Sequence, residues 1–148
     1  MATGDLNAAV AGDQAKRARR ALEEVCARGD FAKAPELYGA EFIDHVNDED
    51  FHGMDGIRRS VENYLRVLDG LVIRVEDQVS ESDRVVSRWT ASGSNRGKQV
   101  RVSGITISRF GPDGLIAEDW TVSDNLSLLR QLGVRRALLI GIGWLRSR

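Results

Sequence analysis

The sequence has little of several features, and each shortage excludes a class of protein. It contains one cysteine in 148 residues, so no internal disulfide can form, and a reducing compartment such as the cytoplasm is the expected location. The formal net charge is −1, which argues against binding nucleic acid through a strong basic excess. These shortages predict a cytoplasmic protein without a nucleic-acid partner.

Long hydrophobic runs are also missing. The longest is ALLIGIGWL near the C-terminus, far shorter than the roughly 20 residues of a membrane-spanning helix. The first residues, MATGDLNAAVAGDQAK, have neither an apolar core nor a basic start, so they do not resemble a secretory signal peptide. We therefore expect no membrane partner and no export.

Residues that could bind a metal or act as a nucleophile are few. The two histidines, His45 and His52, lie seven positions apart with acidic residues between them, which is not a metal-ligand spacing. The single cysteine, Cys26, falls on a helical pattern with no histidine near it in sequence. We expect no metal site, and a packing role for the thiol.

The composition is that of an ordinary globular chain. Apolar residues make up 42% and charged residues 29%, and the length fits a single domain over residues 1–148. We place its core at about residues 14–133 and a tail at 134–148. The tail is apolar with basic ends. It could be a pocket lid, a dimer arm or a membrane-surface helix, and we favour packing on the same domain or on a twin subunit.

The first half of the chain has the period of helices. Residues 1–10 look like a loose start, and apolar residues then recur at helical spacing over residues 14–28 and 56–68, with a short helix at about 31–37 between them. Asp13 and Asp55 are candidate N-caps, and Gly29 and Gly70 are candidate stops. The segment AEFIDHVNDEDFHG, residues 40–53, alternates weakly and ends in a polar loop.

The second half changes to a period of two. Four segments, at about residues 71–80, 84–94, 98–110 and 114–123, read as antiparallel strands joined by polar turns. A short helix capped by Asp124 and stopped by Gly133 follows them. Helices followed by a strand meander predict an α+β fold, with a curved, cone-shaped antiparallel sheet wrapped over the N-terminal helices. The mouth of such a cone can hold a ligand.

Several segments in this order carry a resemblance. They are LYGAEFIDHV, GMDGIRRSV, DRVVSRWTASGSNRG, VSGITISRF and GLIAEDWTVSDNLSLLRQLG. The chain resembles the SnoaL-like polyketide cyclases, which have the nuclear-transport-factor-2-like fold, over about residues 14–133. The resemblance implies a small α+β barrel, a homodimer formed through the outer face of the sheet, and a deep apolar pocket for a bulky hydrophobic small molecule. It also implies that an aspartate moves protons on a carbon acid without a metal or organic cofactor.

The sequence departs from that family at the catalytic position. In the alignment the aspartate of the cyclases falls on Thr121, and a histidine of the preceding strand falls near Thr106. A threonine cannot act as a general base at neutral pH. Asp119 lies two residues before Thr121 and so shares its strand face. We expect Asp119 to be the general acid/base, unless a one-residue register shift turns Glu118 inward instead.

Other candidates surround this position. Asp44 and His45 are further catalytic candidates, but adjacent residues of an extended segment point to opposite faces, so at most one can enter the pocket. Gly104 could mark a bulge in its strand. The expected substrate-binding residues are Tyr64, Trp89, Thr106, Ser108, Trp120 and Thr121.

The leading functional hypothesis is a cofactor-independent acid/base enzyme that cyclises a hydrophobic, polyketide-like secondary metabolite, as in antibiotic biosynthesis. One alternative is an epoxide or lactone hydrolase, or an isomerase, that uses the same pocket. The other is a non-catalytic module that binds a small molecule, which the threonine at position 121 favours.

Overall fold

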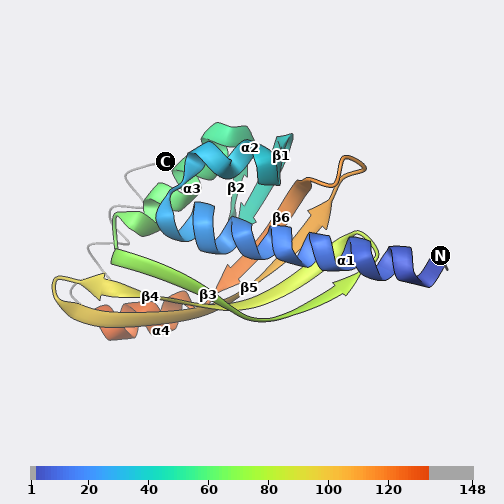
Figure 1. The fold of residues 1–148 in the computed structure, drawn as a ribbon. Coiled ribbons are helices and arrows are strands. Elements are labelled where there is room, and N and C mark those ends of the chain that lie inside the picture. The colour runs from blue at the N-terminus through green and yellow to red at the C-terminus, as the bar shows by residue number, and fades with distance from the viewer. Residues whose placement is uncertain (1–2, 134–148) are drawn as a thin grey trace.

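The fold is a curved sheet with helices packed on its concave side (Figure 1). The computed structural model describes residues 3–133, so the predicted roles of the tail lie outside the described residues. In chain order the elements are α1 (Thr3–Arg20), the π-helical turn η1 (Ala21–Cys26), the 3₁₀ turn η2 (Phe31–Lys33), α2 (Ala34–Leu37), β1 (Tyr38–Val46), β2 (Glu49–His52), α3 (Gly53–Leu65), β3 (Asp69–Glu81), β4 (Arg84–Asn95), β5 (Lys98–Phe110), β6 (Ile116–Ser123) and α4 (Asn125–Leu132).

The sheet has six strands in the order β2-β1-β6-β5-β4-β3. The predicted antiparallel meander is confirmed as β3 to β6. The weakly alternating segment before it adds two more strands, because β1 pairs with β6 in parallel and β2 folds back antiparallel on β1. The sheet is therefore mixed rather than wholly antiparallel, and within residues 3–133 it does not close into a barrel, since β2 and β3 are both edges.

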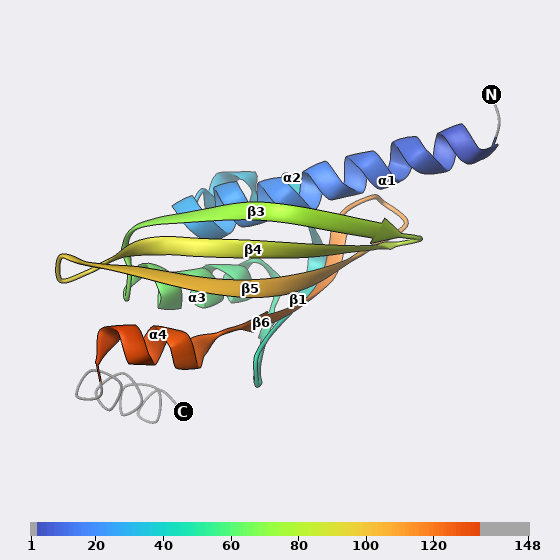
Figure 2. The same cartoon turned by 90° about the horizontal axis from the view of Figure 1, so that it is seen from below.

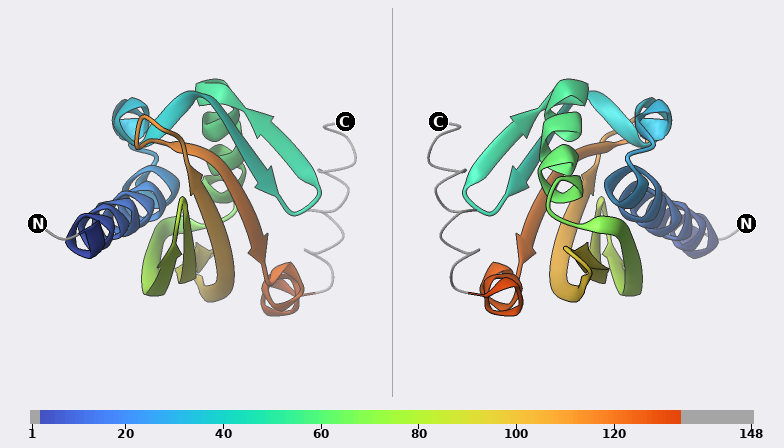
Figure 3. Two further views of the ribbon diagram at one scale, coloured as in Figure 1. Left: turned by 90° about the vertical axis from the view of Figure 1, so that its right-hand side faces the viewer. Right: turned by 90° about the vertical axis from the view of Figure 1, so that its left-hand side faces the viewer.

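Helices α1 and α3 lie over the concave face, whereas α4 lies past the end of β6, beside β5 (Figure 2). Seen end-on, the strands curl around α3, with α1 beside it (Figure 3). Seen from below, strands β3, β4 and β5 lie in front of α3, with their outer face toward the viewer (Figure 2). The predicted α+β class and the helix layer are confirmed.

Two helix boundaries were predicted wrongly. Helix α1 begins at Thr3 rather than near residue 14, because the alanine-rich start has enough helix propensity to extend the first turns. Helix α3 runs from Gly53 to Leu65, about three residues earlier than expected. Asp55 therefore lies in its first turn, where a carboxylate stabilises the positive end of the helix, instead of capping it.

Helix α4 follows the prediction. The Asp124 carboxylate accepts a hydrogen bond of 2.9 Å from the backbone N–H of Ser127, and Gly133 ends the helix with φ +87°. Both end signals predicted from the sequence are thus in place.

The core consists of two groups of buried side chains under the helix layer. One lies around Phe42, Leu37 and Ile116, and the other around Trp89 and Leu71. Members of both groups border the cavity described below. The cavity therefore lies inside the core, between sheet and helices.

Candidate functional site

A cavity opens between the helices and the concave face of the sheet. It has an empty volume of about 790 Å³, counting the space at its mouth. Its lining residues are mostly apolar, and none of them is Lys, Arg or His: Leu22, Cys26, Tyr38, Phe42, Asp44, Val46, Ile57, Ser60, Val61, Tyr64, Leu68, Leu71, Ile73, Trp89, Ala91, Val102, Asp119, Thr121 and Leu128. Among the described residues, the cavity thus holds carboxyl groups without a basic side chain in its lining.

Two aspartates lie side by side in this cavity. The parallel pairing of β1 with β6 places Asp44 opposite Asp119, and both side chains line the cavity. Asp119 is only 6% exposed, and its Oδ1 is buried with no hydrogen-bond partner among residues 3–133. Asp44 is half-buried, and its Oδ2 accepts a hydrogen bond of 2.8 Å from the hydroxyl of Ser60 on α3. The two carboxyl groups therefore have different surroundings.

The different surroundings give the carboxyl groups of Asp44 and Asp119 different pKa values. Burial raises the pKa of Asp44 to about 6, although the Ser60 hydrogen bond and the charge of His45 both lower it. Burial, and then the charge of Asp44, raise the pKa of Asp119 well above its ordinary value, against the effect of a hydrogen bond with Ser108. The carboxylate form is therefore favoured more at Asp44 than at Asp119. Of the two groups, Asp44 is better suited to accept a proton and Asp119 to donate one.

Tyr38 and Cys26 border the same part of the cavity. The Tyr38 hydroxyl lies 3.7 Å from Cys26 Sγ. Burial raises the pKa of the Cys26 thiol to about 12 and that of the Tyr38 hydroxyl well above its usual value. Both groups are therefore neutral at physiological pH, and the protonated thiol is a poor nucleophile. Sequence reasoning missed Tyr38, although the alternation of Phe42, Asp44 and Val46 could have indicated a strand facing the cavity.

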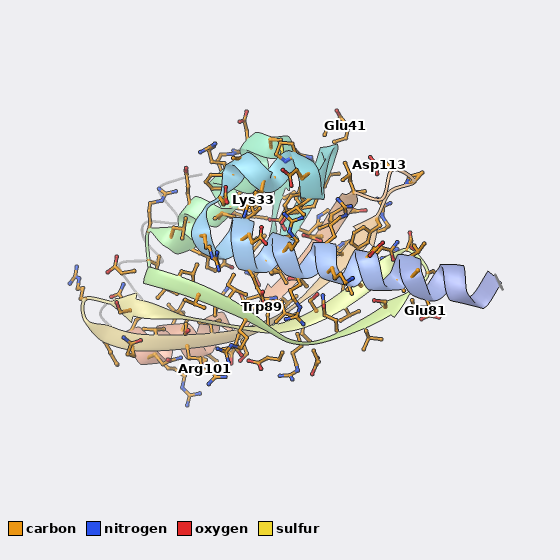
Figure 4. All side chains as sticks on the ribbon, in the orientation of Figure 1. Lys33, Glu41, Glu81, Trp89, Arg101 and Asp113 are labelled. Atoms are coloured by element: carbon orange, nitrogen blue, oxygen red, sulfur yellow. The ribbon has the colours of Figure 1, made fainter. Side chains whose placement is uncertain are left out.

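Three of the expected substrate-binding residues line the cavity: Tyr64, Trp89 and Thr121. Trp89 lies between α1 and the strands, whereas Arg101 extends from the opposite side of the sheet (Figure 4). The Tyr64 hydroxyl is 3.4 Å from the Ser123 hydroxyl. These residues give the cavity an apolar wall with hydroxyl groups set into it.

Thr106 and Ser108 lie behind that wall and are absent from the lining. Both are fully buried. The Thr106 hydroxyl accepts a hydrogen bond of 3.0 Å from the indole N–H of Trp89 and lies 3.0 Å from the hydroxyl of Thr121. Thr106 therefore fixes two residues that contact the cavity, and Ser108 acts on Asp119 through its hydrogen bond.

Gly104 does not mark a bulge, contrary to the expectation from the sequence. The β4–β5 ladder runs through it in regular register, with Trp89 directly opposite. A Cβ at position 104 would lie 2.3 Å from Cζ2 of the indole. The absence of a side chain is what lets the Trp89 ring lie flat against β5.

His45 and Trp120, by contrast, lie on the outer face of the sheet and do not line the cavity. The imidazole Nδ1 is 2.6 Å from Asp50, its Nε2 is 2.8 Å from Glu118, and its ring stacks on Trp120 at 5.4 Å. Strand pleating explains the separation, because Asp44 and His45 are neighbours and must face opposite ways. The same alternation turns Glu118 outward and Asp119 inward.

The described residues, 3–133, include no cluster of three or more side chains suited to a metal ion. None of the helices in that range is long and apolar enough to cross a membrane.

Comparison with protein families identifies one family. The sequence model of the SnoaL-like polyketide cyclases matches residues 16–132. A Bacillus cereus ATCC 10987 protein assigned as a polyketide cyclase is 26% identical, with a TM-score of 0.74 over 82% of this chain and 80% of that one. TsrD from Streptomyces laurentii is 27% identical, with a TM-score of 0.68 over 84% of this chain and 96% of its own. No match was found among curated proteins.

Proposed function

Because the chain belongs to the SnoaL-like polyketide cyclase family, we propose that it is an acid/base enzyme that cyclises a hydrophobic, polyketide-like secondary metabolite. One observation carries the proposal. Asp44 and Asp119 face the same apolar cavity from neighbouring strands, and their surroundings favour one carboxylate and one carboxylic acid. Such a pair supplies a proton acceptor and a proton donor, so the reaction needs no cofactor.

The proposed chemistry is an intramolecular aldol reaction. Asp44 takes a proton from the carbon next to a substrate carbonyl, while Asp119 donates a hydrogen bond, then its proton, to the carbonyl oxygen as that oxygen becomes negative. The resulting enol carbon attacks a second carbonyl of the same molecule and forms the new carbon–carbon bond. The proton on Asp44 passes to the new alkoxide, and the enol returns its proton to Asp119 as the carbonyl re-forms.

The lining supports an uncharged substrate. Within residues 3–133, the cavity contains two carboxyl groups and no lining Lys, Arg or His. An anionic group on the substrate would be desolvated beside the Asp44 carboxylate without a counter-charge, which is unfavourable. The Oδ1 of Asp119, which has no partner among the same residues, can bind a substrate oxygen.

A test of the first chemical step does not require the natural substrate. We expect the protein to catalyse exchange of the α-hydrogens of 2-tetralone, a hydrophobic bicyclic ketone, for deuterium in D₂O, followed by ¹H NMR. An analogue with a carboxylate on the ring should exchange at least about tenfold more slowly per molecule of enzyme, because of the charge of Asp44. Binding of bicyclic and tricyclic ketones without any catalysed exchange would support a binding module instead. Water-derived ¹⁸O in the products of epoxides or lactones would support a hydrolase.

The pH dependence of the exchange rate should follow the ionisation of Asp44 and Asp119. Asp44 accepts a proton only when ionised, so activity should fall as pH decreases through about 6. Asp119 donates only when protonated, so activity should fall again where it ionises, well above the ordinary range of an aspartic acid. The measurement is kcat/KM for exchange between about pH 4.5 and 9.5. A rate that stays constant down to the acid end of that range would contradict the role of Asp44.

The proposal includes a cytoplasmic homodimer. The outer face of the sheet exposes Val72, Val79, Ile105 and Val122, which are 46–68% exposed in the single chain. Apolar side chains gathered on one sheet face are typical of a surface that pairs with a second subunit. Sedimentation velocity would distinguish the dimer from a monomer.

A further inference from the structure

A second polar cluster lies directly behind the aspartate pair, on the outer face of the same two strands. Its central residues, His45 and Glu118, are the chain neighbours of Asp44 and Asp119. The imidazole Nε2 lies 2.8 Å from Glu118 on β6, and Nδ1 lies 2.6 Å from Asp50 on β2. A carboxylate only accepts hydrogen bonds, so satisfying both contacts requires a hydrogen on each ring nitrogen, and the imidazole is then a cation.

Residues of β2 and β6 contact this cation directly, and residues of β5 and β4 contact those partners in turn. Glu118 also accepts two hydrogen bonds, of 2.8 and 3.1 Å, from Arg109 on β5. The imidazole stacks on Trp120 of β6, and the guanidinium of Arg84 on β4 lies 5.3 Å from the centre of that indole. The hydrogen bond with Glu118 contributes most to the raised pKa of His45, and the bond with Asp50 also raises it.

We propose that His45 is a positioning residue for Asp44: it joins β1 to β6 beside the aspartate pair, and its positive charge favours the ionised form of Asp44 from the far side of the sheet. The consequence for catalysis rests on the function proposed above. The electrostatic coupling between the two side chains does not.

The inner face shows why this charge matters. Burial opposes ionisation of Asp44, and among the lining residues the group that offsets it is the Ser60 hydroxyl, which is uncharged. In the described part of the chain, the titratable groups around Asp44 on this face are Asp119, Tyr38, Cys26 and Tyr64, and none of them is a cation. The positive charge that favours the Asp44 carboxylate comes instead from His45. His45 thus adds to the larger effect of the Ser60 hydrogen bond without occupying space in the cavity.

The coupling can be measured without any activity. In His45→Gln, the pKa of the Asp44 carboxyl, followed by ¹³C NMR, should rise by roughly half a unit to one unit, because the cation is replaced by a neutral amide. His45→Lys keeps a positive charge and should leave the pKa near its wild-type value. Coupling is reciprocal, so Asp44→Asn should lower the pKa of His45 by a similar amount. The only other histidine, His52, is exposed and serves as an internal reference.

A matched control is an ion pair elsewhere on the outer face. Arg88 and Asp77 are joined at 2.6 Å across β4 and β3, and Arg88→Gln should leave the Asp44 pKa unchanged. An unchanged Asp44 pKa in a folded His45→Gln variant would overturn the proposal. A shifted pKa in a protein that exchanges no ketone would keep the coupling and refute the cyclase function. If both the coupling and the proposed function hold, His45→Gln should shift the acid limb of the pH–rate profile to higher pH. The exchange rate should then fall at about pH 6 and change very little about two pH units higher.

Discussion

Asp44→Asn should lower the rate of ketone exchange about a hundred- to ten-thousand-fold, the usual contribution of a general base. The substitution keeps the size of the side chain and an oxygen that can accept the Ser60 hydrogen bond, but an amide does not take up a proton at neutral pH. The loss should appear in kcat, because the cavity keeps its shape. Steady-state exchange of 2-tetralone measures it.

The matched control is Asp77→Asn, which removes an exposed carboxylate of the outer face and should leave the rate within about twofold, since surface substitutions have small effects. Asp119→Asn should lower the exchange rate less than Asp119→Leu does, because an amide still donates a hydrogen bond. An Asp44→Asn variant that keeps more than about half of the wild-type rate, in a folded protein, would remove Asp44 from the mechanism.

Asp44→Asn should also be more stable than the wild type at neutral pH. A carboxyl group whose folded pKa is about 6 instead of 3.8 binds more protons in the folded state, so stability falls as pH rises through that interval. Above that interval the cost reaches about 3 kcal/mol at most. Urea denaturation at about pH 7.5 and about pH 4 should show the stability gain of Asp44→Asn at the higher pH only. The protein therefore keeps a destabilising carboxylate where the proposed reaction needs it.

Gly104→Ala should destabilise the protein by about 1–3 kcal/mol, the range for forcing a methyl group into a packed core. The added Cβ would lie 2.3 Å from the Trp89 ring, so the indole must move, and its hydrogen bond with Thr106 is lost or stretched. Because Trp89 lines the cavity, a displaced ring would change the shape of the cavity, so ketone binding should weaken as well. Urea denaturation and Trp fluorescence with and without 2-tetralone measure the two effects.

Gly12→Ala is the control for the intrinsic effect of replacing glycine. Gly12 is exposed on α1, and apart from its chain neighbours and the local helix backbone, no atom of the described residues lies within 4 Å of the position that an added methyl group would take. Alanine there should stabilise the helix by up to about 1 kcal/mol. A loss of stability in Gly104→Ala together with a gain in Gly12→Ala would show that the contact with Trp89 causes the loss. Equal stability of Gly104→Ala and the wild type would contradict the packing described for β5.

Local sequence patterns predicted those elements of the fold that depend on contacts between near neighbours in the chain. The alternation in β3 to β6 and the end signals of α4 were sufficient, because one face of each strand is buried and the cap is a contact between near neighbours. Alternation put Asp119 on the same strand face as Thr121, and the family resemblance then implied that this face lines the cavity. Its role in catalysis stays a proposal.

The pairing of β1 with β6 could not be read in the same way. Its partner segments are far apart in the sequence, and the polar residues of β2 resemble those of a loop. Without that pairing there was no reason to place Asp44 beside Asp119, to choose it over His45, or to connect Ser60 of α3 with either. The outward turn of His45 then follows from the pleat alone.

The parallel contact between β1 and β6 also has a consequence for folding. It joins residues about 75 positions apart, and such distant contacts pay a large loop-closure entropy before they gain stability. The hairpins β3–β4 and β4–β5 join near neighbours and should form earlier. A refolding chain should therefore recover its sheet signal and its buried tryptophan first, and bring Asp44 beside Asp119 only when β6 docks against β1.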